Sequence, residues 1–312
     1  MQYQNFISKE QIDMEDNKIS SNNFKDKKIV IFGEDTLLGK ALIHVFQAEN
    51  INLESPSKEK VDIFNVSSIE HYLEEIKPDY VINTVGYDLI QDAEKHPDEA
   101  FRLNKILPYR LSRLLKKKNI FFVNYSTDYV FDGKKDSPYT VEDKPNPTSI
   151  YGKSKLEGEK VILESGISNF LIIRTSLLFG PWKNNFVENI LELIKKNKKI
   201  TVINDKVMSP TYTLDLAKYS LLLLKKNAKG IFHLCNSGQA SWCELASQVA
   251  KMIGSKCKIE PVKSDKRSYT LFPSYSVLDT TKFYKLTHIK PRSWVQALQE
   301  YLFVFHSSYF EE

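Results

Sequence analysis

Residues 27–46 read KKIVIFGEDTLLGKALIHVF, and this stretch decides the fold. The apolar run Ile29-Val30-Ile31-Phe32 ends at Gly33, which is typical of a strand that is buried on both faces in a parallel sheet. Gly39 then leads into an apolar helical segment that continues to Phe46. A strand, a turn with glycines and a helix can bind the phosphates of a dinucleotide at the helix N-terminus. Two glycines at a strand–helix turn are also common for structural reasons alone. The turn by itself therefore does not decide between a cofactor site and a purely structural turn.

The alternation of short apolar runs and helical segments continues outward from this stretch. Strands are expected near residues 51–53, 61–63, 80–83, 120–124 and 170–174, and helices at 68–76, 98–117, 153–164, 186–195, 242–253 and 294–301. Alternating strands and helices indicate βαβ units with right-handed crossovers. We therefore expect an α/β fold with a Rossmann-type, doubly wound parallel sheet.

Beyond about residue 180 the pattern loosens into turns and shorter pieces, which indicates a second, smaller lobe. We expect a disordered tail at 1–26, a dinucleotide-binding domain at 27–180 and a mainly substrate-binding lobe at 181–312. Part of residues 205–236 is expected to return to the first domain. Since no Pro/Gly linker separates the lobes, they should share a cleft.

Composition and charge exclude several classes of protein. The 312 residues are 42% hydrophobic and 27% charged, which is typical of a globular chain, and the net charge is +5. The lysines are scattered among 39 acidic residues, so we expect no nucleic-acid and no membrane partner. The chain has no apolar run of about 18 residues, and the polar residues 1–26 do not resemble a secretory signal. We expect a cytoplasmic protein.

Cysteine and histidine spacing indicates neither a disulfide framework nor a metal site. The three cysteines are odd in number and contain no C-x-x-C pair; they are Cys235, Cys243 and Cys257. The six histidines include no pair at the helical spacing of metal ligands. We therefore expect no metal.

Tyr151 and Lys155 stand four residues apart, so they would lie on one face of a helix. A lysine ammonium beside a phenol favours the phenolate and lowers its pKa, which makes the tyrosine usable in proton transfer near neutral pH. Spacing alone does not distinguish this pair from two residues on the surface of a helix. The sequence upstream adds a second signal, because an apolar strand at 121–125 ends in Ser126-Thr127. Open α/β sheets place their working residues at such carboxyl ends. Thr127 is therefore expected to donate a hydrogen bond to a substrate carbonyl that Tyr151 protonates.

Four strings surround these residues in a fixed order: STDYVFDG at 126–133, Pro138-Tyr139, Asn146-Pro147 and YGKSKLEGE at 151–159. Together they resemble the dTDP-4-dehydrorhamnose reductase family, a branch of the extended short-chain dehydrogenases/reductases. Further matches run in family order from Lys77-Pro78-Asp79 to Trp294. Only residues 1–26 lie outside the resemblance.

The resemblance implies a reductase that transfers hydride from NADPH or NADH to the 4-keto group of a nucleotide-activated deoxysugar. The partner would be a nucleoside-diphosphate keto-deoxysugar in a pathway that supplies surface polysaccharide, and the enzyme would be a monomer or a homodimer. Two alternatives stay open. One is a non-catalytic, nucleotide-binding regulatory homologue, such as the regulatory subunit of methionine adenosyltransferase, which resembles the same family. The other is a nucleotide-sugar epimerase that reoxidises its own intermediate.

The resemblance also assigns residues to sites. Cofactor contacts fall on Gly33, Thr36, Leu37, Leu38 and Gly39 in the first turn, on Asp62 and Ile63 near the adenine, and on Thr84, Val85 and Gly86 under the cofactor. The catalytic trio falls on Thr127, Tyr151 and Lys155, of which Tyr151 and Lys155 also contact the cofactor. Substrate contacts fall on Thr127, Asp128, Leu177, Asn185 and Phe272.

Several residues depart from the family pattern. Thr36 stands in place of a glycine where the backbone should approach phosphate, which puts cofactor affinity in doubt. Leu177 replaces a tryptophan, Phe272 replaces an arginine, and Lys206 and Met208 replace a Gln and a Gly. Since these last four lie on the substrate side, we expect an altered sugar or nucleotide specificity and poor reduction of dTDP-4-dehydrorhamnose.

The signals for cofactor choice disagree. Glu54 near the end of the second strand would hydrogen-bond the ribose hydroxyls of NADH and repel the 2′-phosphate of NADPH. Ser55 and Lys58 follow directly, and a hydroxyl with an ammonium would suit that phosphate. We predict that NADPH binds at least as tightly as NADH.

Overall fold

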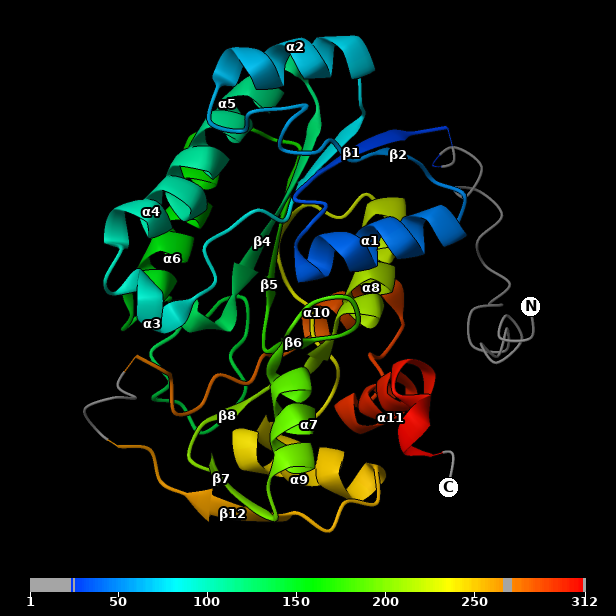
Figure 1. The fold of residues 1–312 in the computed structure, drawn as a ribbon. Helices are drawn as coiled ribbons and strands as arrows, with labels where there is room; N and C mark the ends of the chain where they lie inside the picture. Colours follow the sequence, from blue (N-terminus) through cyan, green and yellow to red (C-terminus); the bar gives the residue numbers. More distant parts are fainter. Residues whose placement is uncertain (1–23, 25, 266–270, 311–312) are drawn as a thin grey trace.

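The structure is a computed structural model, and it describes residues 24, 26–265 and 271–310. Its centre is a six-stranded parallel sheet with the order β2-β1-β3-β4-β5-β10 (Figure 1). The strands are β1 (Lys28–Phe32), β2 (Asn52–Glu54), β3 (Tyr80–Asn83), β4 (Phe121–Thr127), β5 (Phe170–Thr175) and β10 (Gly230–His233). The predicted α/β fold with a parallel sheet is confirmed.

Strand β1 shows why the sheet is buried on both faces. Ile29 and Ile31 belong to the apolar core on one side of the sheet, while Val30 and Phe32 belong to the core on the other side. Because side chains alternate along a strand, only a continuous apolar run can fill both cores.

Helices cover the two faces of the sheet (Figure 1). On one face lie α1 (Leu37–Ala48) and α8 (Thr213–Lys225), whose buried residues join the core around Ile29. On the other face lie α2 (Val66–Ile76), α5 (Leu107–Lys118) and α6 (Ile150–Glu164). Short α3 (Ile90–Ala93), α4 (Pro97–Phe101) and a π-helical segment at Arg102–Ile106 precede α5.

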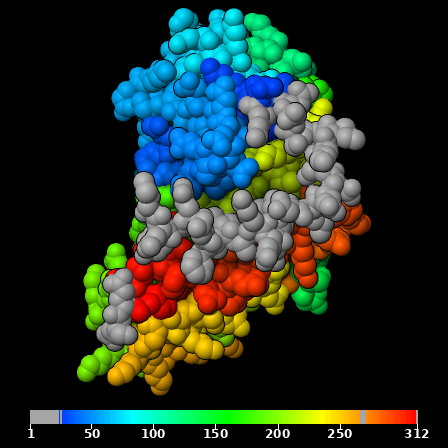
Figure 2. All heavy atoms as spheres, turned by 90° about the vertical axis from the view of Figure 1, so that its right-hand side faces the viewer, coloured from blue at the N-terminus to red at the C-terminus, as the bar shows by residue number. Residues whose placement is uncertain are grey.

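The second lobe lies beyond the carboxyl ends of the strands (Figure 1). Its helices include α7 (Phe186–Lys196), α9 (Trp242–Met252) and α11 (Trp294–Phe305), and α10 (Thr281–Thr287) packs on β10. Three strand pairs complete it: β7 (Lys199–Ile203) with β12 (Lys258–Val262), β8 (Val207–Met208) with β11 (Ala240–Ser241), and β6 (Leu178–Phe179) with β9 (Thr211–Tyr212). Figure 2 shows α11 (red) below α1 (blue) on one face of the molecule.

Two expectations about local structure were wrong. Residues 61–63 form no strand; they lead through a turn into α2, although Val61 is buried against that helix. The segment after residue 180 contains more than short pieces, because α8 is a full helix that packs against α1. Helix 98–117 is present, but it is divided by the π-helical segment.

The expected tail at 1–26 lies mostly outside the described residues. Phe24 is described, and only 6% of its surface is exposed. Its ring lies 5.3 Å from that of Tyr80. The packed part of the chain therefore extends to Phe24, three residues before the expected boundary at Lys27.

Candidate active site

The carboxyl end of β4 and the first turn of α6 meet beside Tyr151. The Glu94 carboxylate accepts the N–H of Ile150 at 2.6 Å, which holds the N-terminus of α6. A Cβ on Gly152 would lie 2.2 Å from the carbonyl oxygen of Tyr129. Only glycine therefore lets the helix approach the strand end this closely, and it does so at the residue after Tyr151.

The predicted trio Thr127, Tyr151 and Lys155 comes together at this point. Burial raises the pKa of Tyr151 well above its ordinary value, and a hydrogen bond with Thr127 opposes the rise. The Nζ atom of Lys155 donates to the carbonyl oxygen of Tyr125 at 2.6 Å, and burial lowers the pKa of Lys155 to about 8. The expectation that Lys155 lowers the pKa of Tyr151 was wrong for this arrangement, since burial of the phenol dominates. A phenol that stays protonated is suited to give its proton to an alkoxide.

Asp128 occupies a different place from the one expected. Its side chain is 1% exposed, and it accepts hydrogen bonds from the hydroxyls of Thr127 (3.0 Å), Ser176 (2.8 Å) and Ser276 (2.5 Å). Burial raises the pKa of Asp128 to about 6, and the hydroxyls oppose the rise. The carboxylate therefore faces the interior, and its expected contact with the substrate stays a prediction.

The first turn is built from Gly33, Thr36 and Gly39. A Cβ on Gly39 would lie 2.0 Å from the Gly33 carbonyl oxygen, so the turn can close only with glycine there. The Thr36 hydroxyl accepts the Gly39 N–H at 2.9 Å and bonds the Thr84 hydroxyl at 2.8 Å. The side chain of Thr36 is therefore turned into the protein as the N-cap of α1, and the expected obstruction of the phosphates is corrected.

The N-terminus of α1 keeps donors for a ligand. Within the described part of the chain, the main-chain N–H groups of Leu37 and Leu38 have no hydrogen-bond partner. Free N–H groups at a helix N-terminus bind phosphate well. The residues present therefore fit the pyrophosphate of a dinucleotide.

The residues at and after the end of β2 bear on the choice between NADH and NADPH. The Ser55 hydroxyl donates to the carbonyl oxygen of Ile31 at 2.9 Å, so it is turned towards the sheet and is not available to a 2′-phosphate. The Glu54 carboxylate lies near Tyr72, whose pKa is raised to about 12 by burial and by the charge of Glu54. Asp62 lies in the turn before α2, where its carboxylate accepts the Phe64 N–H at 2.9 Å.

The segment Thr84–Gly86 follows β3 and runs beside Lys155. A Cβ on Gly86 would lie 3.0 Å from Oδ1 of Asn104 and 3.6 Å from Nζ of Lys155. Asn104, in the π-helical segment, accepts the Tyr87 N–H at 2.9 Å and donates to the Tyr87 carbonyl at 3.0 Å. The sequence analysis missed this role of Asn104, although Leu103-Asn104 lies within the resemblance.

A cleft of about 560 Å³ opens between residues 88–92, which follow this segment and include part of α3, and the second lobe. It is lined by Asp88, Leu89, Ile90, Gln91, Asp92, Trp242 and Phe272. A row of aromatic rings runs along it: the Tyr129 ring lies 5.4 Å from Tyr151 and 6.0 Å from Phe272, which lies 5.1 Å from Trp242. The carboxylate of Asp88 opposes ionisation of Tyr151. Asp88 and Trp242 are site residues that the sequence analysis did not single out.

The other expected substrate residues lie in different places: Phe272 lies in the cleft, Leu177 packs against the core and Asn185 caps a helix. Phe272 lines the cleft, and its carbonyl accepts the Nζ of buried Lys206 at 2.8 Å. Leu177 is partly buried and packs against the main core. Asn185 is the N-cap of α7, since Oδ1 accepts the Val187 N–H at 3.0 Å and Nδ2 donates to the Gly180 carbonyl at 2.8 Å. Asn185 thus has a structural role as a cap, and its expected contact with the substrate stays a prediction.

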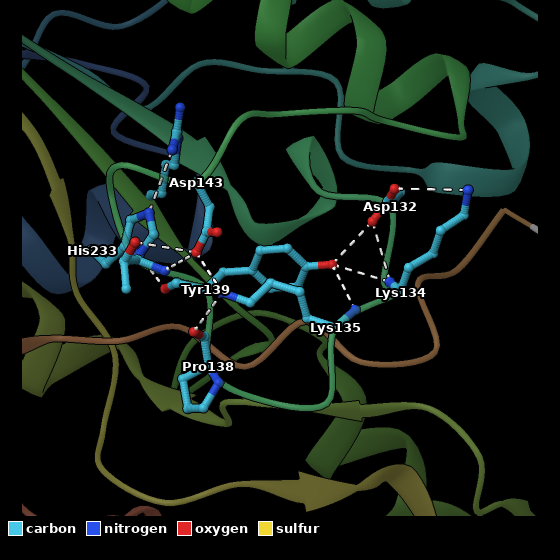
Figure 3. Close-up of polar contacts among 9 residues, drawn as sticks. Asp132, Lys134, Lys135, Pro138, Tyr139, Asp143 and His233 are labelled. Atoms are coloured by element: carbon cyan, nitrogen blue, oxygen red, sulfur yellow. Dashed lines mark hydrogen bonds and ion pairs between the residues drawn. The ribbon is translucent and has the colours of Figure 1, made fainter.

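The loop that joins β4 to α6 is held by Tyr139 (Figure 3). Its hydroxyl donates to Asp132 at 3.0 Å and accepts the main-chain N–H groups of Lys134 and Lys135. Its carbonyl oxygen lies 3.0 Å from Nδ1 of His233, which donates to it. The loop that leads into the catalytic helix is thereby tied to the edge strand β10.

The described residues show neither a metal-binding cluster nor a membrane-spanning helix. Among them, no cluster of three His, Cys, Asp or Glu side chains could hold a metal ion. None of the described helices is both long and apolar enough to span a membrane.

Comparisons with known proteins show the family to which the chain belongs. The chain matches the family model described as RmlD substrate binding domain over residues 27–306. It is 34% identical to the spore coat polysaccharide biosynthesis protein SpsK of Bacillus subtilis, covering 88% of this chain and 96% of that protein. The dTDP-4-dehydrorhamnose reductase of Clostridium acetobutylicum superposes with a TM-score of 0.84 at 32% identity, covering 89% of this chain and 99% of that chain. The dTDP-4-dehydrorhamnose reductase of Bacillus anthracis, in complex with NADP, superposes with a TM-score of 0.84 at 29% identity, covering 88% of this chain and 98% of that chain. The expected resemblance is confirmed, and the chain belongs to the RmlD family of dTDP-4-dehydrorhamnose reductases and their relatives.

Proposed function

We propose that this protein transfers a hydride from NADPH or NADH to the 4-keto group of a nucleotide-activated deoxysugar. The observation that carries the proposal is the joining of Thr127, Tyr151 and Lys155 at the carboxyl end of β4, beside the cleft that Phe272 lines. We place the reaction in the cytoplasm, where nicotinamide cofactors and nucleotide sugars are available.

The residues of the chain divide the work. The bound dihydronicotinamide supplies the hydride. Tyr151 donates its phenolic proton to the oxygen of the reduced carbonyl, and its raised pKa keeps that proton in place at neutral pH. The Thr127 hydroxyl donates to Asp128 in this structure; turned to the substrate, it would donate a hydrogen bond that stabilises the developing charge on this oxygen. Lys155, next to Gly86, holds the ribose hydroxyls of the cofactor.

Cofactor selectivity depends on the residues that follow β2. The Ser55 hydroxyl donates to the Ile31 carbonyl, so Lys58 alone remains of the two residues expected to favour a 2′-phosphate. The relative from Bacillus anthracis is described in complex with NADP, which supports our prediction that NADPH binds at least as tightly as NADH. Fluorescence titration of both at one ionic strength tests it. A tenfold preference for NADH would mean that Glu54 contacts the ribose.

The sugar specificity is proposed to differ from that of dTDP-4-dehydrorhamnose reductases. Phe272 places an apolar ring in the cleft where the family has a cation, and a lost charged contact to phosphate costs about 1–3 kcal/mol. The similar SpsK protein is described as acting in spore coat polysaccharide biosynthesis. We infer that this chain reduces a related keto-sugar for a surface polysaccharide.

One assay separates the three candidate functions. Purified protein is incubated with NADPH or NADH and a panel of dTDP- and UDP-linked 4-keto-6-deoxysugars, and both cofactor and sugar are followed. A reductase oxidises one cofactor for each sugar that gains a 4-hydroxyl. Conversion of sugar without net cofactor oxidation would indicate the epimerase, and binding without turnover would indicate the regulatory homologue.

A further inference from the structure

A buried ion pair lies directly behind the catalytic trio. Glu159 on α6 and Arg174 on β5 each have side chains that are 2% exposed. The guanidinium of Arg174 holds the carboxylate with two hydrogen bonds, Nε to Oε1 at 2.9 Å and Nη2 to Oε2 at 2.6 Å. Two parallel bonds of this kind fix both distance and orientation.

The same carboxylate also joins the two elements that carry the trio. Three successive residues of β4 form hydrogen bonds with three residues of α6. The helix residues, 151, 155 and 159, stand four apart and therefore lie on one face of the helix. The pairs are Tyr125 with Lys155, Ser126 with Glu159, and Thr127 with Tyr151. The Ser126–Glu159 bond, at 2.5 Å, is the one that contains no residue of the trio.

We propose that Glu159 is a positioning residue for the reduction, which sets the register of α6 against β4 and places a carboxylate on the helix face that carries Lys155. The proposal rests on the reductase function proposed above. Loss of the Ser126–Glu159 link would let the phenol of Tyr151 move relative to the hydroxyl of Thr127. A displacement of about 1 Å can cost a hundredfold in rate.

The charge of Glu159 acts on Lys155 as well. Burial lowers the pKa of Lys155 to about 8, while the carboxylates of Glu159, on the same helix, and Asp88, in the loop after β3, oppose this. The other groups around Nζ are neutral: the Tyr125 carbonyl from β4 and Oδ1 of Asn104 beside Gly86. Removing the Glu159 carboxylate should therefore lower the pKa of Lys155 further.

The groups that face Glu159 come from β4, β5 and β10. Besides Arg174 and Ser126, the nearest group is His233, whose Nε2 lies 3.5 Å from Nη1 of Arg174. Burial lowers the pKa of His233 to about 3, so its ring is neutral at working pH. The Phe131 ring lies 5.2 Å from the guanidinium carbon of Arg174. The carboxylate of Glu159 is thus held in a fixed position by Arg174 and Ser126.

The test compares Glu159→Gln with Glu157→Gln, a control on the same helix whose carboxylate pairs with Lys105 and Lys160 at the surface. Lysine acetylation by trace acetic anhydride is measured by mass spectrometry over a pH series, which gives the midpoint for Lys155 without any need for activity. We expect a midpoint near 8 in wild type and Glu157→Gln, and a clearly lower one in Glu159→Gln. At pH 7, kcat should fall about a hundredfold in Glu159→Gln alone.

A second variant keeps the test informative if Glu159→Gln does not fold. Ser126→Ala removes the link to β4 and leaves the charge, so kcat should fall by about tenfold while the Lys155 midpoint stays unchanged. Wild-type kcat in Ser126→Ala, or an unchanged Lys155 midpoint in folded Glu159→Gln, would overturn the proposal. A wild-type protein that reduces no sugar would instead defeat the proposed function, and the midpoints would still report on Glu159.

Discussion

Tyr151 is the residue on which the proposed reduction depends most directly. Replacing it by Phe keeps the ring contact with Tyr129 but removes the proton donor. We expect kcat to fall by about two to four decades, the usual scale for loss of a general acid, while the dissociation constant of NADPH changes little. Steady-state kinetics and cofactor titration measure the two effects. Turnover near the wild-type rate in Tyr151→Phe would remove Tyr151 from the mechanism.

Individual side chains show what the sequence can and cannot predict at this scale. The trio was predictable because Tyr151 and Lys155 are fixed by helical spacing and Thr127 by the end of an apolar strand. The position of the Asp128 carboxylate was not predictable from the sequence, because it is held inward by a hydrogen bond from Ser276, which lies 148 residues away along the chain. Thr36 was misread for a similar reason, since its hydroxyl bonds Thr84 on a neighbouring strand end.

At the scale of an element, the N-terminus of α1 combines a cap with a proposed phosphate site. Thr36→Ala removes the acceptor of the Gly39 N–H. We expect the free energy of unfolding to fall by about 0.5–2 kcal/mol, as for other lost caps, and cofactor affinity to change little. Urea unfolding and NADPH titration check this. A tenfold gain in affinity would show instead that the threonine obstructs the phosphates.

The π-helical segment before α5 serves the loop that follows β3. A π segment inside a helix is often found at a functional site, and here it presents Asn104 to both main-chain polar groups of Tyr87 and to the Ser154 hydroxyl. Asn104→Ala would leave these groups without their partner and loosen the segment beside Gly86. We expect the dissociation constant of NADPH to rise about tenfold.

Calorimetry must accompany the titration of Asn104→Ala, because a general loss of stability would also weaken binding. The expected result is weaker cofactor binding at a temperature where the variant is fully folded. Unchanged NADPH affinity under those conditions would show that Asn104 does not support the cofactor site.

Helices and strands with a clear hydrophobic period were predictable from the sequence. The two exceptions, α8 and residues 61–63, have physical reasons. Helix α8 was missed because it is buried on most of its surface: its buried residues include polar Thr213, Asp215 and Ser220 as well as the apolar residues that pack in the main core. A helix without a polar face has no amphipathic period to detect. Val61–Ile63 has the composition of a strand, but no neighbouring strand pairs with it among the described residues.

At the scale of the whole molecule, the two lobes are joined through residues next to the active site. Tyr139 donates its N–H to the Val277 carbonyl at 2.8 Å, and its own carbonyl accepts the Asp279 N–H at 2.7 Å. Asp128 accepts the hydroxyl of Ser276 from the same segment. A shared cleft was expected from the lack of a linker, but these contacts are between residues far apart in the sequence and could not be read from it.

Asp128 makes this junction sensitive to pH. Burial raises its pKa to about 6 in the folded protein, whereas an unfolded aspartate titrates near 4. Between these values the folded state holds more protons than the unfolded state, so the contribution of Asp128 to stability falls as pH rises from about 4 to about 6. Below this window the protonated carboxyl carries no cost, and above it the buried charge is fully present.

Asp128→Asn should abolish this dependence, because an amide does not titrate. The free energy of unfolding of wild type minus that of Asp128→Asn is expected to decrease by up to about 3 kcal/mol between pH 4 and pH 7. Urea unfolding at several pH values measures it. Ser276→Ala removes a hydrogen bond that holds the pKa of Asp128 down, so it should move the decline to higher pH. A difference that stays constant with pH would mean that Asp128 is charged throughout and that the junction between the lobes does not respond to pH through this residue.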